Sequence, residues 1–205
     1  MGLKTLDELL IIHGSDKATE HTRTYAKPHG YSVVMEKYFA PLRDKPIKFL
    51  EVGIGGGESA RAWLDYFENA EIYGVDFVQN TNIFNQPGKP YKRYTFSHGD
   101  QTDRTMWKCF LANHGKDWDV IVDDGSHRND GIITTFEEMW PNLKSGGYYM
   151  IEDLGAGCTP GTVFVVGGFP THMDWIRDRM TEMNLGTNDI ESIHLTKELA
   201  VFKKR

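Results

Sequence analysis

Cysteine, long apolar runs and positive charge are all scarce in this chain of 205 residues. Its two cysteines, Cys109 and Cys158, form no CxxC pair and show no metal-ligand spacing, so a disulfide framework is not expected. Cys109 lies in an apolar stretch with helical spacing, which predicts a small, buried hydrophobic side chain. With 40% hydrophobic and 25% charged residues, the composition is that of a globular protein with a packed core.

The shortage of apolar runs and of positive charge argues against two classes of partner. No stretch is long enough for a membrane span or a signal peptide, so we expect a cytoplasmic protein with no membrane partner. The formal net charge is -6, and attraction to phosphate requires a basic face, so we expect no nucleic-acid partner.

Short runs rich in Tyr, Ile, Val and Phe alternate with longer segments that carry apolar residues at helical spacing. This alternation predicts βαβ units and a mostly parallel central sheet with helices on both faces, an α/β fold. The expected strands are 47–52, 71–76, 91–97, 120–123 and 147–152. The expected helices between them are 58–67, 102–112 and 131–143.

Further elements flank this core. Helices are expected at 6–12 and 31–42, joined by a polar segment, and at 172–183. Residues 155–170 are rich in glycine and apolar side chains and are expected to form a loop or lid, whereas 190–195 and 199–203 predict a C-terminal antiparallel hairpin. We therefore expect a single domain over 1–205, divided into an N-terminal helical or lid segment (1–45), a Rossmann-like core (46–154), an acceptor-side loop (155–171) and a C-terminal helix with hairpin (172–205).

Glycines follow the first expected strand and precede a helix that begins near Ser59. Gly53, Gly55 and Gly57 let the backbone turn sharply and let a ligand approach the main chain. The dinucleotide pattern GxGxxG would require glycine at 58, where Glu58 stands, and no GK[ST] follows, so a P-loop is excluded. A strand-to-helix loop that binds nothing is the alternative.

The charges around this loop favour S-adenosylmethionine (SAM) as the ligand. Glu51, inside the strand, would repel a pyrophosphate but would suit the ammonium group of an amino acid. Asp76, at the end of the second strand, is placed to accept hydrogen bonds from ribose hydroxyls, and Asp100 and Gln101 are placed to bind an adenine amino group. Helix capping is the alternative role for Asp100.

Acidic side chains also follow the fourth and fifth expected strands. Because ligands bind at the carboxyl ends of parallel strands, these residues are expected to share one crevice with His127. They are Asp123, Asp124, Glu152 and Asp153. Clustered carboxylates repel one another unless a cation binds among them, and an oxygen cluster prefers a hard cation such as Mg²⁺, Ca²⁺ or Mn²⁺. His127, expected in the first turn of the next helix, is a candidate general base.

Several runs of the chain, taken together, resemble a known family: HGSDK (13–17), HGYS (29–32), FLEVGIGGGESARAW (49–63), GDQTD (99–103), VDDGSH (122–127) and IEDLG (151–155). They are similar to the metal-dependent sugar O-methyltransferases of antibiotic biosynthesis, which include macrolide-sugar and rhamnosyl enzymes, and to the cephalosporin hydroxylase-like family. The resemblance covers most of residues 10–155 and implies a Rossmann-like class I methyltransferase fold.

The resemblance also implies roles for individual residues. Asp124, Glu152 and Asp153 would bind the metal, His127 would be the base, and Asp123 would face SAM. The implied SAM contacts run along the glycine loop, and the full set of expected cofactor contacts is Glu51, Gly53, Gly55, Gly57, Ser59, Asp76, Phe77, Asp100, Gln101 and Asp123. The HGSDK and HGYS segments would close over the cofactor or the acceptor, which gives Ser15, Lys17, His29 and Tyr31 a binding role; a surface loop is the alternative.

The expected function is SAM-dependent, Mg²⁺-assisted O-methylation of a sugar hydroxyl on a natural product or polysaccharide. A catechol enzyme, an amino-sugar N-methyltransferase and a non-catalytic SAM-binding protein are the alternatives, and a nicotinamide oxidoreductase or a SAM-independent binding protein is disfavoured. Phe164, Phe169 and Trp175 would form either an apolar wall over the acceptor or part of the core. The acceptor itself and a homo-oligomeric state stay open.

Overall fold

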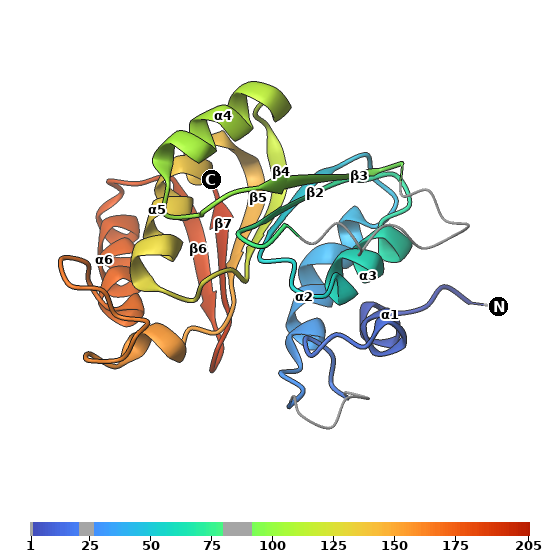
Figure 1. Cartoon of the computed structure of the whole chain (residues 1–205), viewed down its shortest axis with the longest axis horizontal. Helices are drawn as coiled ribbons and strands as arrows, with labels where there is room; N and C mark the ends of the chain where they lie inside the picture. Colours follow the sequence, from blue (N-terminus) through green and yellow to red (C-terminus); the bar gives the residue numbers. More distant parts are fainter. Residues whose placement is uncertain (1, 21–26, 80–91) are drawn as a thin grey trace.

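The fold is organised around one mixed sheet in a computed structural model that describes residues 2–20, 27–79 and 92–205. Its seven strands lie in the order β3-β2-β1-β4-β5-β7-β6. Strands β1 to β5 run parallel, and β7 pairs antiparallel with both β5 and β6 (Figure 1). The strands are β1 (Lys48–Val52), β2 (Glu71–Asp76), β3 (Tyr94–His98), β4 (Trp118–Asp123), β5 (Leu143–Ile151), β6 (Ile190–Leu195) and β7 (Ala200–Lys204).

Helices cover both faces of this sheet. Helices α1, α2 and α3 lie on one face and α4, α5 and α6 on the other, each set packed over its own apolar cluster (Figure 1). The helices are α1 (Leu6–His13), α2 (Tyr31–Phe39), α3 (Glu58–Tyr66), α4 (Arg104–His114), α5 (Asn129–Met139) and α6 (His172–Leu185), with short 3-10 turns η1 (Ala40–Leu42), η3 (Trp140–Asn142) and η4 (Ala156–Cys158).

The alternation of side chains along β4 explains why there are two clusters. Val120 and Val122 are buried under the first set of helices, and Ile121 is buried under the second. Successive side chains of a strand point to opposite faces, so a central strand that is covered on both sides needs an uninterrupted apolar run. Burying each such side chain stabilises the fold by roughly 1.5–3 kcal/mol.

The expected α/β architecture and the C-terminal hairpin are confirmed. Strands β2 and β6 begin and end where the sequence predicted, and the other strands are shifted by a few residues. Residue Tyr91 of the strand expected at 91–97, and residues 21–26 of the polar segment expected at 14–30, lie outside the described residues. The expected division of the chain into one domain with four segments stays a prediction.

Two expectations for helices are wrong. The helix expected at 131–143 ends at Met139 and gives way to η3, because Pro141 cannot continue an α-helix. Cys109 is exposed, because α4 turns Trp107 and Phe110 toward the core and therefore turns the two residues between them outward.

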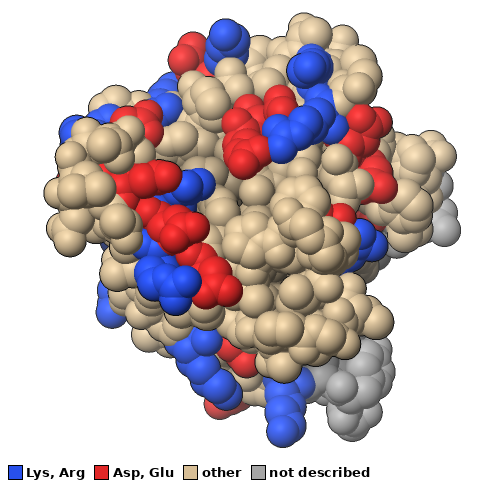
Figure 2. Space-filling view, turned by 90° about the vertical axis from the view of Figure 1, so that its left-hand side faces the viewer, with Lys and Arg blue, Asp and Glu red and all other residues tan. Residues whose placement is uncertain are grey.

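The face that carries α6 shows charges of both signs side by side (Figure 2). On α6, Arg177 pairs with Asp174 at 2.7 Å and Arg179 pairs with Glu182 at 2.5 Å. In the described part of the chain, this face carries no basic patch of the kind that attracts phosphate. Within residues 2–20, 27–79 and 92–205, no helix has the length and apolar character needed to cross a membrane.

Candidate active site

The glycine loop between β1 and α3 packs directly against the backbone that follows β4. Gly53 has a φ of 84°, and a Cβ atom at this position would lie 2.0 Å from the carbonyl oxygen of Asp124. Only glycine combines this left-handed conformation with so close a contact. Gly57 also has a positive φ and forms the N-cap of α3. The loop is therefore a rigid turn at the carboxyl edge of the sheet.

Asp76, at the end of β2, holds this turn from the other side. One of its carboxylate oxygens accepts hydrogen bonds from the backbone nitrogens of Ile54 at 2.7 Å and Gly55 at 3.1 Å. The other accepts a hydrogen bond from Val78 at 2.7 Å. Ribose hydroxyls that bind Asp76, as the sequence predicts, would share the carboxylate with these amides.

Two cavities of about 430 and 420 Å³ meet at this loop and share Gly53, Asp76 and Gly125 in their walls. Each volume lies within the usual range for small-molecule sites. Of the expected site residues, the first cavity also contains Phe77, Asp100 and Gln101, and the second contains Ser15, Lys17, Gly55, Ser59, Asp124, His127 and Asp153. The structure thus brings the glycine loop and the acidic loops, which carry Asp124 after β4 and Asp153 after β5, into one continuous region.

Glu51 is buried beneath the second cavity, between the sheet and α3. Neither of its carboxylate oxygens has a hydrogen-bond partner of good geometry among the described residues, although Ser59 and Trp63 lie near it. Burial raises the pKa of Glu51 to about 7, and the charge of Lys17 opposes this rise. A buried, poorly solvated carboxylate of this kind suits a cationic ligand.

Asp123 and Gln101 form a buried network rather than an open ligand surface. The Gln101 amide donates to Asp123 at 3.1 Å and to Thr135 at 3.1 Å, and its oxygen accepts a hydrogen bond from the Ser126 nitrogen at 2.5 Å. Burial raises the pKa of Asp123 to about 6. Asp100 is exposed, and its carboxylate accepts hydrogen bonds from Thr102. Of the two expected adenine contacts, Asp100 is therefore the more accessible side chain.

Lys17 lies among the carboxylates that were expected to surround a metal ion. Its Nζ atom donates to Asp124 and to Glu152, the latter at 2.8 Å, and only 2% of the residue is exposed. Burial raises the pKa of both carboxyl groups, and the Lys17 charge opposes that rise. Burial disfavours the ammonium form of Lys17, but the surrounding carboxylates outweigh this effect and raise its pKa well above the usual value.

His127 and Asp153 both adopt the strained left-handed backbone conformation, each with a φ of 53°. Such conformations cost on the order of 1–3 kcal/mol in non-glycine residues and are concentrated at functional sites. His127 precedes α5 rather than lying in its first turn, so that detail of the sequence expectation is wrong. Its Nε2 atom lies 3.5 Å from an oxygen of Asp153, and its buried Nδ1 atom has no hydrogen-bond partner among the residues that the structure describes.

The acidic loops present donor atoms that suit a hard cation. Ligand atoms of Asp124, His127 and Asp153 lie within 4.8 Å of one another. Glu152, next to Asp153 in the chain, has a buried Oε1 atom with no hydrogen-bond partner in the described part of the chain. The residues present therefore fit a divalent cation bound mainly by carboxylate oxygen, the ligand type that Mg²⁺ prefers.

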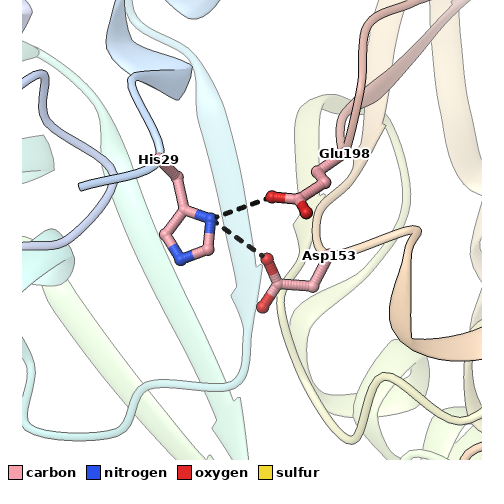
Figure 3. Close-up of side chains that lie close together, drawn as sticks. All are labelled: His29, Asp153 and Glu198. Atoms are coloured by element: carbon pink, nitrogen blue, oxygen red, sulfur yellow. Dashed lines mark hydrogen bonds and ion pairs between the residues drawn. The ribbon is translucent and has the colours of Figure 1, made fainter. Parts of the chain in front are cut away.

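His29 and Tyr31 approach the same loops from the start of α2. The Tyr31 hydroxyl donates to Oδ1 of Asp153 at 2.6 Å. The Nδ1 atom of His29 lies 3.3 Å from Glu198 and 3.6 Å from Asp153 (Figure 3). Both residues line a third cavity of about 520 Å³, beside the turn between β6 and β7. Sequence reasoning missed Glu198, because nothing in its local pattern connects it with the site.

The loop at 155–170 is anchored by Asn129, the first residue of α5. The Asn129 amide donates to the carbonyl oxygens of Val166, Phe169 and Pro170, at 3.1 to 3.3 Å. Trp175 belongs to the core over the α5 face, which settles one of the alternatives left open for it.

Comparisons with known proteins match this architecture. A methyltransferase from the mycinamycin biosynthetic pathway, solved in complex with Mg, SAH and mycinamycin VI, aligns with a TM-score of 0.82 and 23% identity over 98% of this chain and 54% of that one. A TDP-rhamnose 3'-O-methyltransferase of calicheamicin biosynthesis aligns with a TM-score of 0.52 and 14% identity over 83% of this chain and 77% of its own. These likenesses show the fold.

Sequence relatives point in the same direction. The 8-demethyl-8-(2-methoxy-alpha-L-rhamnosyl)-tetracenomycin-C 3'-O-methyltransferase of Streptomyces olivaceus is 33% identical over 76% of this chain and 38% of the relative. The demethylmacrocin O-methyltransferase of Streptomyces fradiae is 30% identical over 88% of this chain and 42% of the relative. The chain thus spans about two fifths of the length of these relatives. No family model matches it. The chain has the class I methyltransferase fold and is a homologue of the sugar O-methyltransferases of antibiotic biosynthesis.

Proposed function

We propose that this protein transfers a methyl group from SAM to a hydroxyl of a sugar or glycosylated small molecule, with help from a divalent cation. One observation carries the proposal: the glycine loop shares a cavity with Asp124, His127 and Asp153. A cofactor bound at the glycine loop and a hydroxyl group bound near Asp124 and Asp153 would therefore lie next to each other. The names of its sequence relatives, which methylate rhamnosyl and other sugar groups, support the choice of acceptor.

The residues of the chain divide between the two ligands. The negative charge of Glu51, beside the glycine loop, would attract the ammonium group of SAM. Asp76 would accept hydrogen bonds from the ribose hydroxyls of SAM. Asp124 and Asp153, with Glu152, would hold the cation. When bound, SAM supplies an electrophilic methyl group, and a hard cation lowers the pKa of an alcohol that it coordinates. We propose Mg²⁺ as this cation.

His127 is the proposed base. In this role its Nε2 atom would accept the proton that the acceptor hydroxyl loses as the oxygen forms its bond to the methyl carbon, while the bond between that carbon and the SAM sulfur breaks and S-adenosylhomocysteine leaves. The role is supported by the position of this Nε2 atom, which lies 3.5 Å from Asp153 in the cavity that the glycine loop also lines. The same geometry supports a second role, in which His127 is a cation ligand in place of Glu152, since it is His127 that lies within 4.8 Å of the other two ligands.

The first test combines acceptor screening with a matched pair of variants. Purified protein is incubated with SAM, Mg²⁺ and a panel of rhamnosylated, catechol and amino-sugar acceptors, and release of S-adenosylhomocysteine is measured. We expect turnover with a rhamnosylated acceptor, loss of turnover on addition of EDTA, and recovery with excess Mg²⁺. Turnover that does not change on addition of EDTA would refute the role of the cation. Turnover only with a catechol or an amino sugar would refute the proposed sugar hydroxyl as the acceptor.

The variants Asp124→Ala and Asp119→Ala lie at opposite ends of β4 and separate chemistry from folding. Asp119 binds Lys144 at 2.8 Å, far from the cavities that meet at the glycine loop. We expect Asp124→Ala to abolish turnover while calorimetry still detects SAM binding, and Asp119→Ala to retain both. His127→Ala distinguishes its two roles. If His127 is the base, the variant should lose turnover but bind the cation normally, and if it is a ligand, the variant should bind the cation more weakly.

A further inference from the structure

Each carboxylate of the proposed cation site is held by a donor from the segment that precedes the Rossmann-like core. Lys17 donates to one oxygen of Asp124 and one oxygen of Glu152. The Tyr31 hydroxyl donates to Oδ1 of Asp153 at 2.6 Å. The two donors lie in the segments HGSDK and HGYS, whose role as a lid over the ligands was expected from the sequence.

These hydrogen bonds leave one oxygen of each carboxylate for another partner. Oε1 of Glu152 is buried and has no hydrogen-bond partner within residues 2–20, 27–79 and 92–205. Oδ2 of Asp153, the oxygen that the Tyr31 hydroxyl does not bind, lies 3.5 Å from Nε2 of His127. The pattern is that of ligands whose outer oxygens are fixed by the protein while their inner oxygens remain for an ion.

We infer that Lys17 and Tyr31 are positioning residues, which orient Asp124, Glu152 and Asp153 for the divalent cation. The inference rests on the proposed function, since it concerns the same cation site. Partners of this kind fix the orientation of metal ligands, and their removal typically lowers metal affinity 10- to 100-fold.

The geometry supports a role for Lys17 and Tyr31 in orienting the carboxylates rather than in covering a bound ligand. Lys17 is almost completely buried and forms part of the wall of the second cavity, so it is not a side chain that lies over a bound ligand. The carboxylates of buried Glu152 and half-buried Asp124 repel each other, and the ammonium that binds both keeps them in place. The backbone joins the two donors, because the nitrogen of Ser32 donates to the carbonyl oxygen of Lys17 at 3.0 Å and that of His29 donates to Asp16 at 2.8 Å.

Tyr31→Phe provides the cleaner test, because it removes one hydroxyl and no charge. The probe is Mn²⁺, whose free concentration is measured by electron paramagnetic resonance in the absence of SAM and acceptor. We expect Tyr31→Phe to bind Mn²⁺ at least about 10-fold more weakly than the wild type. The matched control is Tyr66→Phe, which also removes a tyrosine-to-carboxylate bond, to Glu36 at 2.8 Å, outside the site. It should bind Mn²⁺ normally.

Lys17→Met tests the second donor, with Lys144→Met as its control. Removing a positive charge would by itself strengthen the binding of a cation, so we expect weaker Mn²⁺ binding by Lys17→Met to come from lost orientation. The weakening should persist when the pH is raised from 7 to 8, because a higher pH disfavours protonation of the carboxylates, the other possible cause. Tighter binding would mean that Lys17 competes with the ion and would overturn its assignment. Circular dichroism establishes that each variant is folded, and if Lys17→Met does not fold, Tyr31→Phe alone decides the inference.

The outcomes separate this inference from the proposed function. If the wild type binds Mn²⁺ and Tyr31→Phe binds it equally well, the positioning role is wrong and the proposed cation site stands. If the wild type binds no Mn²⁺ at millimolar concentration, the cation site and the role of its positioning residues are refuted together. The proposal that the protein binds SAM does not depend on this result.

Discussion

Replacement of Glu51 by glutamine should make the ligand-free protein more stable and weaken its binding of SAM. Glu51 is fully buried, and burial raises its pKa to about 7 from an ordinary value of 4.5. Glutamine has nearly the same shape and carries no charge, so Glu51→Gln removes the cost of keeping an ionised carboxylate out of water. The same change removes the negative charge that we propose binds the ammonium group of SAM.

The expected gain in stability depends on pH. Below pH 4.5, Glu51 is protonated in both folded and unfolded chains and resembles glutamine, so the two proteins should be equally stable. As pH rises through 7, the unfolded chain releases the proton first, and the wild type loses stability relative to the variant. A pKa difference of about 2.5 units corresponds to about 3 kcal/mol. Glu51→Gln should therefore exceed the wild type by about that amount at pH 8.

Urea denaturation at pH 5 and pH 8, followed by circular dichroism, measures this difference. The control is Glu68→Gln, which removes a carboxylate on an exposed side chain and should change stability little at either pH. The reasoning fails if Glu51→Gln is less stable than the wild type at pH 8, or if the difference between the two proteins is the same at both pH values. Calorimetry with SAM completes the test, and unchanged affinity would remove Glu51 from the cofactor site.

Three other predictions follow from local geometry. Gly53→Ala places a Cβ 2.0 Å from the Asp124 carbonyl oxygen at a φ of 84°, so it should lower the free energy of unfolding by at least about 2 kcal/mol; wild-type stability in urea would contradict this. Asn129→Ala should destabilise the protein by about 1–3 kcal/mol and speed amide exchange at Val166, whose nitrogen donates to Asn129 at 2.8 Å; unchanged exchange would refute the anchoring role. Cys109, being exposed, should react with a maleimide in the native protein, and protection until urea is added would show that it is buried.

Most of the fold could be predicted from the sequence, because the parallel strands are short apolar runs with clear boundaries. The C-terminal hairpin was predicted for the same reason: two apolar runs, now β6 and β7, flank a polar turn. The error at the end of α5 came from counting apolar residues while overlooking Pro141, and the error at Cys109 came from treating an apolar helix as buried on every side.

The candidate site was predictable only in part. Residues near the strand ends, such as Gly53 and Asp124, could be placed because the carboxyl edge of a parallel sheet gathers them. The pairing of Lys17 with Asp124, 107 residues away, follows from the path of the N-terminal segment and leaves no local signal. The left-handed backbone of His127 was equally invisible, since its neighbours in sequence do not require it.

The contact between Gly53 and the chain after β4 has a consequence for ligand exchange. The backbone nitrogen of Asp124 also donates to the carbonyl oxygen of Val52 at 2.8 Å, and that of Glu152 donates to the carbonyl oxygen of Asp123 at 3.0 Å. The ends of β1, β4 and β5 are therefore joined by their backbones. Opening the sheet between them would break these bonds together. The strand ends that carry Gly53, Asp124 and Glu152 should therefore keep their spacing when ligands bind and leave.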